Sequence, residues 1–464
     1  MVRTALLWLM ALAALSACAG PQGIASPAAV QTPQLAIVGV AVIPMTEGTT
    51  ILNDRTVLIR DGRIEAIGAR SKVRVPAGAR IIDGKGKYLM PGLADMHVHL
   101  EYIEDPEVLK LFVSRGVTTV RNMDGQPFIL GWRGDVAAGR TIGPRIVTAG
   151  PIIDGSPPAR PDNLAVADAA AARAAVAAQA AAGYDFIKLY SNLSLDAYSA
   201  AVAEARARGL RVAGHIPTAV GLEKALESRW SVEHLGDFAS LMASQGGPPT
   251  PSWARRGLSA PLDQARLAAL AAQLAKAKVW VVPTVIQQDR WLAPKAEVER
   301  WLAEPAIRNI PAAIIAQWRT PMERISSRMD EGDWAMVAQG RRNRLATIAA
   351  FHRAGVPLAV GSDTPNPFVA MGASVHQELA NFVEAGLSPH EALRAATVAP
   401  ARMLGLEREQ GTVEAGKRAD LLLLGSNPLE DVGRAAKPAG MVLAGRWFTA
   451  EELEALPEDF GRGK

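Results

Sequence analysis

Two kinds of hydrophobic pattern divide the chain into segments. Between residues 35 and 90, short apolar runs separated by turns, with a hairpin signal at Asp61-Gly62, predict a small β-sheet unit. After Pro91, apolar runs of strand length alternate with longer helical segments. The predicted strands are residues 93–100, 118–123, 145–149, 185–190, 211–216, 231–235, 279–285 and 358–363.

This alternation predicts an α/β fold. Eight strands alternating with helices are typical of a (β/α)8 TIM-like barrel, here covering residues 91–404. Residues 405–464 return to strands and turns. Because one β unit precedes the barrel and another follows it, residues 35–90 and 405–464 are predicted to pair into one small β-sandwich domain.

One connection is too long for an ordinary link between a strand and a helix. It covers residues 288–344 and carries four tryptophans, Trp291, Trp301, Trp318 and Trp334. We predict a helical insertion over the mouth of the barrel. In the alternative, the tryptophans only pack this segment onto the outer helices.

The N-terminal segment has the pattern of an export signal. Residues 1–17 contain an early positive charge and an apolar stretch that is too short to span a bilayer permanently. The sequence LSAC, which ends at the chain's single cysteine, Cys18, resembles the lipobox of bacterial lipoproteins. Residues 18–34 then read as a lipidated linker. We expect a cell envelope lipoprotein, sorted to the outer membrane and facing the periplasm; an ordinary signal cleaved at Ala17 or Ala19 is the alternative.

Composition and charge narrow the classes of partner. The chain of 464 residues is 49% hydrophobic, which supplies a large core, and its formal net charge is only +4. Its lysines and arginines are scattered rather than clustered, which argues against a nucleic-acid partner. We expect a small-molecule substrate and a membrane contact made by the lipid anchor, and we leave a homo-oligomer open.

Reactive side chains gather at the C-terminal ends of the predicted strands, where barrel enzymes place their active sites. His97 and His99 are two positions apart on one strand, so they share a face, and neutral imidazole is a common zinc ligand. Lys188 lies in an apolar run, where an ammonium group is unfavourable unless it is paired or loses its charge. Three further strands end in His215, His234 and Asp363.

These motifs carry a family resemblance. PGLADMHVHLE, FIKLY, AGHIP, VEHLG and GSDT occur in this order, and the tail segment GTVEAGKRADLLLL follows them. From about residue 35 to residue 448 the chain resembles the amidohydrolase superfamily of metal-dependent hydrolases, in particular its imidazolonepropionase-like and Xaa-Pro dipeptidase-like branch. The resemblance implies two divalent metal ions, expected to be Zn²⁺. It assigns the first ion to His97, His99 and Asp363, the second to His215 and His234, and the bridge between them to a carboxylated Lys188.

The resemblance also implies a reaction. We expect hydrolysis of an amide C–N bond, as in a dipeptide or an N-acyl amino acid, by a hydroxide shared between the two ions. Asp363 would take the proton and deliver it to the departing amine. Tyr190 lies two positions beyond Lys188 and is expected to stabilise the oxyanion. Arg121 is predicted to pair with a substrate carboxylate, with a salt bridge at the barrel rim as the alternative, and His376 is a further candidate for substrate contact.

Two other functions stay open. One is an imidazolonepropionase-like cyclic amidohydrolase or a deaminase with a single metal ion, which would not need Lys188. The other is a catalytically inactive substrate-binding lipoprotein, which would be expected to lack a ligand, although none is missing. The loop after the third strand, residues 149–162, contains no histidine, unlike the dipeptidase branch.

Overall fold

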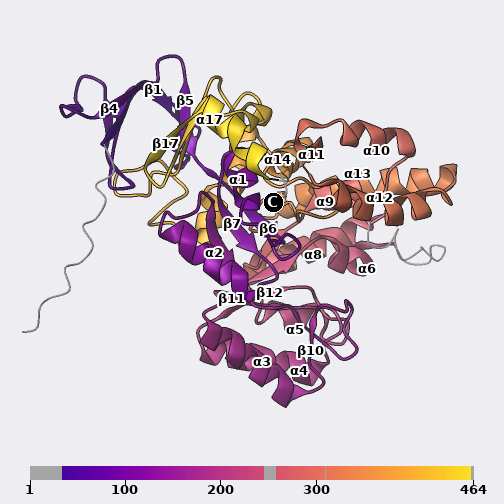
Figure 1. The fold of residues 1–464 in the computed structure, drawn as a ribbon. Helices are drawn as coiled ribbons and strands as arrows, with labels where there is room; N and C mark the ends of the chain where they lie inside the picture. Colours follow the sequence, from indigo (N-terminus) through magenta and orange to yellow (C-terminus); the bar gives the residue numbers. More distant parts are fainter. Residues whose placement is uncertain (1–33, 245–257, 309, 461–464) are drawn as a thin grey trace, which may run out of the picture.

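The computed structural model describes residues 34–244, 258–308 and 310–460 (Figure 1). The predicted signal, residues 1–17, and residues 18–33 of the predicted linker, which include Cys18, lie outside these ranges. Within the described ranges, no helix combines the length and the hydrophobicity that a membrane span requires.

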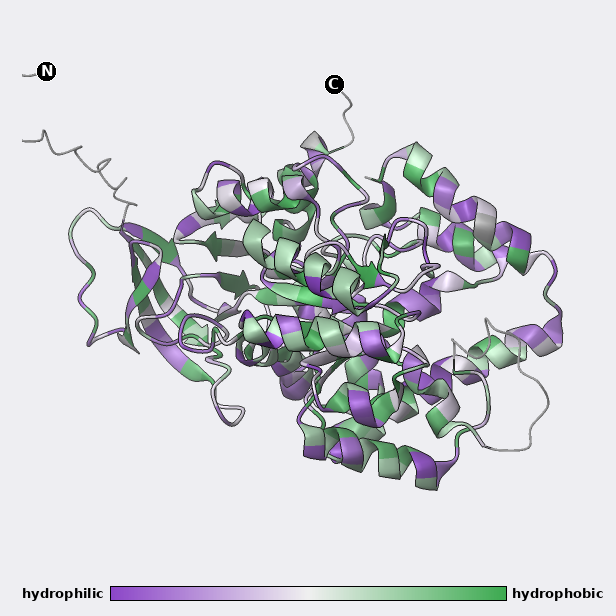
Figure 2. Cartoon of the chain, turned by 90° about the horizontal axis from the view of Figure 1, so that it is seen from below, coloured by the Kyte–Doolittle hydropathy of each residue, from purple (hydrophilic) through white to green (hydrophobic). Residues whose placement is uncertain are grey.

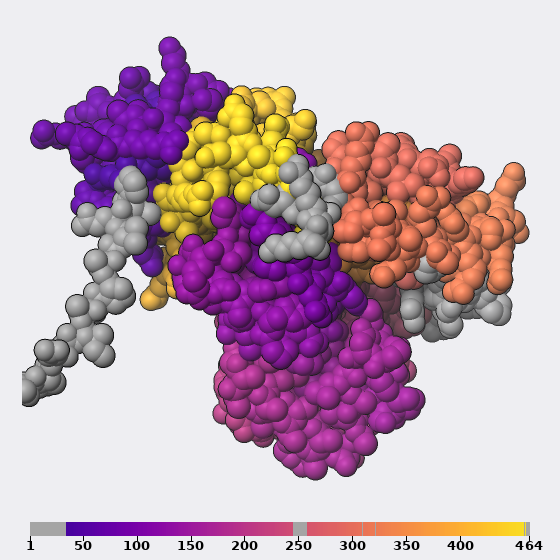
Figure 3. Space-filling view, in the orientation of Figure 1, coloured from indigo at the N-terminus to yellow at the C-terminus, as the bar shows by residue number. Residues whose placement is uncertain are grey.

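An eight-stranded sheet contains both ends of the described chain. Its order is β17-β16-β15-β5-β1-β2-β3, and β4 pairs with β1. The antiparallel pair of β5 and β15 joins the N-terminal segment to the C-terminal one, and Figure 3 shows these indigo and yellow segments against each other. The strands are β1 (Leu35–Val42), β2 (Leu52–Arg60), β3 (Arg63–Ala69), β4 (Arg80–Asp83), β5 (Tyr88–Pro91), β15 (Leu421–Leu424), β16 (Gly440–Leu443) and β17 (Arg446–Thr449).

Seven of the eight strands predicted after Pro91 form in the described part of the chain, and neighbouring strands run parallel. The bridge between Ala149 and Phe186 links β8 to β11. All residues of β6, β7 and β11 are buried, as expected for parallel strands covered on both faces. The strands are β6 (Leu93–Val98), β7 (Val117–Asn122), β8 (Arg145–Thr148), β11 (Phe186–Leu189), β12 (Arg211–Gly214), β13 (Ser231–Glu233) and β14 (Trp280–Val282).

The eighth predicted strand, residues 358–363, is not a regular strand, so that prediction was wrong in detail. Leu358 makes an isolated parallel bridge to Val281 on one side. On the other side, the Asp363 amide donates to the carbonyl of His97 (2.7 Å). Asp363 has a φ of +63°, which lies outside the extended region and interrupts the regular ladder, although Thr364 still forms a parallel bridge with Val98. The segment nevertheless lies between β14 and β6 through these backbone hydrogen bonds.

Helices lie on the connections between these strands. In α3, Asp168 caps the first turn by accepting from the amides of Ala170 and Ala171, and Gly183 ends the helix with a φ of +86°. Figure 2 shows mixed hydrophobic and hydrophilic residues on the helices around a hydrophobic set of central strands. The helices are α1 (Val108–Val113), α2 (Pro127–Ala137), α3 (Ala169–Ala182), α4 (Leu195–Ala207), α5 (Gly221–Leu226), α6 (Ala239–Met242), α8 (Gln264–Ala277), α14 (Ser374–Glu384), α15 (Pro389–Ala395), α16 (Val398–Leu404) and α17 (Ala450–Ala455).

The segment predicted as a helical insertion is helical. It forms the orange group at the right of Figure 1. The rings of Trp301 and Trp318 pack on Phe368, with centroids 5.5 and 5.6 Å away, and Phe368 lies five residues after Asp363. These helices therefore support the loop that follows Asp363. They are α9 (Val285–Trp291), α10 (Lys295–Leu302), α11 (Pro305–Arg308), α12 (Ala312–Ser326) and α13 (Glu331–Arg353).

Candidate metal centre

The six side chains predicted as metal ligands converge at the C-terminal ends of the parallel strands. Asp363 Oδ1 lies 3.4 Å from His97 Nε2 and 3.3 Å from His99 Nε2. Lys188 Nζ lies 3.4 Å from the same His97 Nε2. The His234 ring is 4.6 Å from the His97 ring and 5.0 Å from the His215 ring, centroid to centroid. The structure therefore brings all six together.

Each of the four histidines has its Nδ1 beside a fixed oxygen atom. The partners are Glu233 Oε2 for His97 (2.9 Å), Glu101 Oε1 for His99 (2.6 Å), Asp237 Oδ1 for His215 (3.2 Å) and Thr284 Oγ1 for His234 (2.6 Å). A carboxylate only accepts hydrogen bonds, so in His97, His99 and His215 Nδ1 donates the proton and Nε2 keeps its lone pair when the ring is neutral. Partners of this kind hold metal-ligating histidines in one tautomer and orientation.

The donor set fits divalent metal ions. Candidate ligand atoms of His97, His234 and Asp363 all lie within 4.8 Å of one another, and His99 and His215 flank this group. Asp363 Oδ1 is buried and has no hydrogen-bond partner within the described residues. Lys188 is also buried, with 1% of its surface exposed. An unsatisfied buried carboxylate oxygen among imidazoles is what a bound cation would satisfy.

Burial and mutual charge set the protonation states of this cluster. Burial, reinforced by the Lys188 charge, holds the pKa of His97 well below its usual value, and burial lowers the pKa of His234 to about 3. Burial also lowers the pKa of Lys188. For Asp363, burial acts to raise the pKa, but the charges of His234, His99 and Lys188 together lower it. For His99, burial acts to lower the pKa, but the carboxylates of Glu101 and Asp363 raise it to about 9. Without a bound metal ion, the cluster thus combines neutral His97 and His234 with a protonated His99 and an ionised Asp363.

Local backbone geometry sets the direction of several of the proposed ligand side chains. His234 and Asp363 both have left-handed φ angles, +66° and +63°, which are uncommon for residues with a Cβ and frequent at functional sites. Gly214, just before His215, allows close packing because a Cβ there would lie 2.1 Å from the carbonyl oxygen of Leu189. Glycine before the ligand is therefore a steric requirement at this strand end.

The residues that hold the histidines were not predicted from the sequence. Glu233, Glu101 and Asp237 lie within a few positions of the ligands that were predicted, so the motifs VEHLGD and HVHLE contained them. Thr284 had no such local signal, because it reaches His234 from the connection after β14. Carboxylates close to histidine ligands are the feature that could have revealed the first three.

The prediction for Arg121 was wrong. Its side chain is completely buried, and it donates to Met96 O (2.7 Å), Ser231 Oγ (2.9 Å) and Glu233 Oε2 (2.7 Å). The guanidinium also lies over the ring of Trp230, 5.3 Å from its centroid. Arg121 points into the interior between the strands, where it neutralises Glu233, and has no free face for a substrate carboxylate.

The prediction for His376 was also wrong. His376 is buried in the first turn of α14, and its Nε2 donates to the carbonyl of Arg115 (2.9 Å). Arg115 precedes β7, so this contact lies at the amino ends of the strands, opposite the metal-binding cluster. The chain leaves the cluster after Asp363 and crosses to the other end before α14 begins.

Tyr190 lies beside the cluster. Its ring is 4.4 Å from the ring of His215, in an edge-on arrangement. Burial raises the pKa of the Tyr190 phenol, so the hydroxyl keeps its proton at neutral pH and can donate a hydrogen bond. This position is compatible with the predicted contact to an oxyanion.

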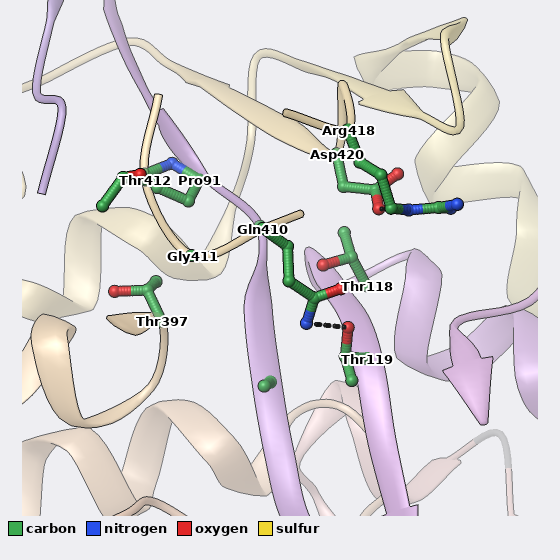
Figure 4. A pocket seen from close by; sticks show the side chains of 11 residues that line it. Pro91, Thr118, Thr119, Thr397, Gln410, Gly411, Thr412, Arg418 and Asp420 are labelled. Carbon is green, nitrogen blue, oxygen red and sulfur yellow. Dashed lines mark hydrogen bonds and ion pairs between the residues drawn. The ribbon is translucent and has the colours of Figure 1, made fainter. Parts of the chain in front are cut away.

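A small polar pocket lies elsewhere. It is lined by Pro91, Gly92 and Thr118, at the amino ends of β6 and β7, and by residues of the C-terminal segment (Figure 4). In this pocket the Gln410 amide donates to Thr119 Oγ1 (3.2 Å). The pocket belongs to the junction with the eight-stranded sheet and lies at the opposite strand ends from the metal-binding cluster.

Comparison with known proteins places this site in a family. The model of the Amidohydrolase family matches residues 88–448. A 5-methylthioadenosine/S-adenosylhomocysteine deaminase of Symbiobacterium thermophilum is 23% identical over 423 residues, covering 84% of this chain and 85% of the deaminase. An imidazolonepropionase of Idiomarina loihiensis is 43% identical over 54 residues, which are 12% of this chain and 13% of that enzyme.

Solved structures agree with this assignment. A bottromycin amidohydrolase has a TM-score of 0.71 and 25% identity, over 91% of this chain and 88% of its own. A putative prolidase from Bifidobacterium longum has a TM-score of 0.66 and 24% identity, over 92% of this chain and 99% of its own, and shows a shared fold. The family predicted from the motifs is confirmed: the chain belongs to the amidohydrolase family.

Proposed function

We propose that the protein is a binuclear metal-dependent hydrolase that cleaves the amide C–N bond of a small molecule, with dipeptides and N-acyl amino acids as the expected substrates. The observation that carries this proposal is the set of four histidines, each with Nδ1 beside a fixed oxygen atom, around Lys188 and Asp363. The likeness to a bottromycin amidohydrolase and to a putative prolidase supports an amide substrate.

His97, His99 and Asp363 would hold one ion, and His215 and His234 the other. Lys188 would bridge them as a carbamate. In that reaction the neutral amine forms an N–C bond with carbon dioxide and loses one proton, which gives an anion with two oxygen ligands. The burial that lowers the pKa of Lys188 favours the neutral amine that this step requires.

When bound, the two ions supply a hydroxide nucleophile at neutral pH and polarise the scissile carbonyl; we expect both to be Zn²⁺. Asp363 is ionised and faces His97 and His99, so it can take the proton of the attacking water and pass it to the departing amine. Tyr190 keeps its phenolic proton and can donate it in a hydrogen bond to the developing oxyanion.

A deaminase or a cyclic amidohydrolase of the imidazolonepropionase type is the second candidate. Its support is the deaminase relative, which aligns with 84% of this chain. Such a reaction with one metal ion would leave the buried Lys188 without a role. A screen of the zinc-loaded protein against dipeptides, N-acyl amino acids, lactones, cyclic amides and aminopurines separates the candidates, because deamination releases free ammonia from an aminopurine and a cyclic amidohydrolase opens the ring of a cyclic amide.

We propose that the parallel strands form the closed (β/α)8 barrel predicted from the sequence. Support comes from residues 358–363, which hydrogen-bond to β14 on one side and to β6 on the other, so the order of neighbours returns to its start. Closure would bring the C-terminal ends of all the strands around one mouth, which is the position of the metal-binding cluster.

Lys188→Ala is expected to lower both metal content and activity. Without the carbamate, the protein loses the anion proposed to lie between two cations, so zinc content should fall from about two ions per chain towards one or none. Elemental analysis of the purified protein measures this. Lys224→Ala, which removes an exposed lysine of α5, is the matched control and should keep wild-type zinc content.

Short carboxylic acids such as acetate should restore part of the activity of Lys188→Ala, because a free carboxylate can occupy the position of the carbamate. A Lys188→Ala protein that keeps two zinc ions and full activity would remove the bridge from the proposal while leaving the histidine ligands in place.

We also propose that the protein is anchored in the cell envelope through a lipid on Cys18. The support is the LSAC motif and the linker after it, which is rich in Pro, Ala, Gln and Ser. Cys18→Ala is expected to release the protein from the membrane fraction of the expressing cells, as judged by immunoblotting after fractionation. If the wild type is already found in the periplasmic fraction, the proposed anchor is wrong.

A further inference from the structure

The loop between β8 and β11 places an arginine beside the metal-binding cluster. Arg160 Nη2 donates to the hydroxyl of Tyr102, and its guanidinium lies 5.7 Å from the centre of that ring. The Tyr102 ring is 5.8 Å from the ring of His99. The charge of Arg160 also acts on the phenol of Tyr190, where it opposes the rise in pKa that burial causes.

Arg160 thus acts on both tyrosines that contact the proposed ligands. Tyr102 packs against His99, which belongs to the first proposed metal site, and Tyr190 packs against His215, which belongs to the second. A group bound to the guanidinium would therefore lie next to both halves of the cluster.

The loop that carries Arg160 is held in one conformation by a buried carboxylate. Asp154 lies in the short strand β9 (Ile153–Asp154), is completely buried, and accepts hydrogen bonds from the amides of Gly155 (2.8 Å), Ala159 (2.7 Å) and Asn192 (2.8 Å). It also accepts from the side chain of Asn163 (3.0 Å). Arg160 lies between two of these anchored positions, so little conformational entropy would be lost when it binds a ligand.

The charge of Arg160 is only partly neutralised. The carboxylate paired with it is Asp162, whose Oδ1 lies 3.6 Å from Arg160 Nε, and the two side chains are 43% and 51% exposed. A guanidinium has five N–H donors, and the hydroxyls of Tyr102 and Tyr190 accept from only part of this set. Arg121, in contrast, is fully buried and uses all three of its nitrogens within the protein.

We propose that Arg160 binds the carboxylate of the substrate, with the Tyr102 and Tyr190 hydroxyls beside it, and so selects substrates in which a free carboxylate lies close to the scissile amide. This inference rests on the proposed hydrolysis of an amide bond. A planar guanidinium can bind a carboxylate through two parallel hydrogen bonds, which fixes orientation as well as position. In a dipeptide or an N-acyl amino acid, one carbon atom separates the carboxylate from the amide nitrogen.

The test uses the zinc-loaded full-length protein and a panel of N-acetyl-L-amino acids and dipeptides, each paired with its C-terminal carboxamide. For Arg160→Gln, KM for the carboxylate compounds is expected to rise about 10- to 150-fold, which corresponds to the loss of one hydrogen-bonded charge pair, with little change in kcat. KM for the carboxamides should change by less than about threefold. Arg160→Lys keeps the charge without the planar fork, so it should fall between wild type and Arg160→Gln.

A matched control comes from the same loop. Asp162→Asn removes the acidic neighbour of Arg160 but no donor, so it should not raise KM for the carboxylate compounds. Equal losses on carboxylates and carboxamides in Arg160→Gln would overturn the inference, because they would mean that Arg160 only supports the loop. Such a result would leave the proposed hydrolysis intact.

Isothermal titration calorimetry with the same compounds separates this inference from the proposed reaction. One outcome is that the wild type binds N-acetyl amino acids, Arg160→Gln does not bind them, and neither protein hydrolyses them. The carboxylate site would then be supported, and the proposed reaction would be wrong. If the wild type neither binds nor hydrolyses any carboxylate compound of the panel, the inference is overturned.

Discussion

Asp363→Asn is expected to lower kcat by at least about 10³-fold while preserving the fold. Asparagine matches aspartate in size but cannot take up a proton, so the step from the attacking water to the leaving amine loses its general base and acid. The change also weakens a proposed metal ligand that faces both His97 and His99. Steady-state kinetics on the best substrate of the hydrolysis screen, with zinc in excess, measures the loss.

A loss of kcat in Asp363→Asn can be assigned to the chemistry only if the variant keeps the wild-type fold. Circular dichroism and thermal unfolding should match those of the wild type to within a few degrees, because the Asp363 amide still donates to the carbonyl of His97. Asp135 lies on α2 and forms an exposed ion pair with Arg140, so Asp135→Asn is the control for losing a carboxylate away from the cluster. If Asp363→Asn kept kcat within tenfold of the wild type, Asp363 would not be the residue that moves the proton.

Arg121→Ala is expected to have the largest effect on stability, lowering the free energy of unfolding by about 3–5 kcal/mol. Glu233 would stay in the interior without its cationic partner, since neither side chain is exposed. The same carboxylate accepts from Nδ1 of His97, so the zinc content of this variant should fall as well. Denaturant unfolding followed by fluorescence gives the change in free energy.

Two further variants test the cause of that loss. Arg140→Ala breaks an exposed ion pair and should change the free energy of unfolding by less than about 1 kcal/mol. Combining Arg121→Met with Glu233→Gln removes both charges and should recover part of the loss of Arg121→Ala. An Arg121→Ala protein with wild-type stability and a raised KM for carboxylate substrates only would restore the original substrate-binding hypothesis.

Most strands of the barrel-like part could be predicted from the sequence, because parallel strands buried on both faces appear as continuous apolar runs. The sequence was insufficient where a single backbone angle decides the outcome. The strand predicted to end at residue 285 ends at Val282 instead, as β14. Thr284 has a φ of +49°, which is not compatible with an extended strand, and α9 begins directly after it at Val285. Asp363 likewise interrupts the regular pairing of its segment through a positive φ, just before the bridge between Thr364 and Val98.

The proposed ligands could be recognised because each lies in a short motif at a strand end, where the fold brings distant segments together. Arg121 was misread because a polar residue near a strand end can point to the mouth or into the interior. Its direction depends on Glu233, which is 112 residues away along the chain. Arg160 was missed because it lies in a loop without periodicity, and only the tertiary contacts with Tyr102 reveal its position.

Anomalous diffraction can locate the two metal ions proposed to lie among the six predicted ligands, which are His97, His99, Lys188, His215, His234 and Asp363. Crystals of the zinc-loaded protein would be grown with bicarbonate and measured on both sides of the zinc absorption edge. We expect two anomalous peaks in each chain, one beside His97 and His99 and one beside His215 and His234, with continuous carbamate density on Lys188 between them. A single peak with an unmodified Lys188, or zinc bound elsewhere, would show that the proposed binuclear centre is wrong.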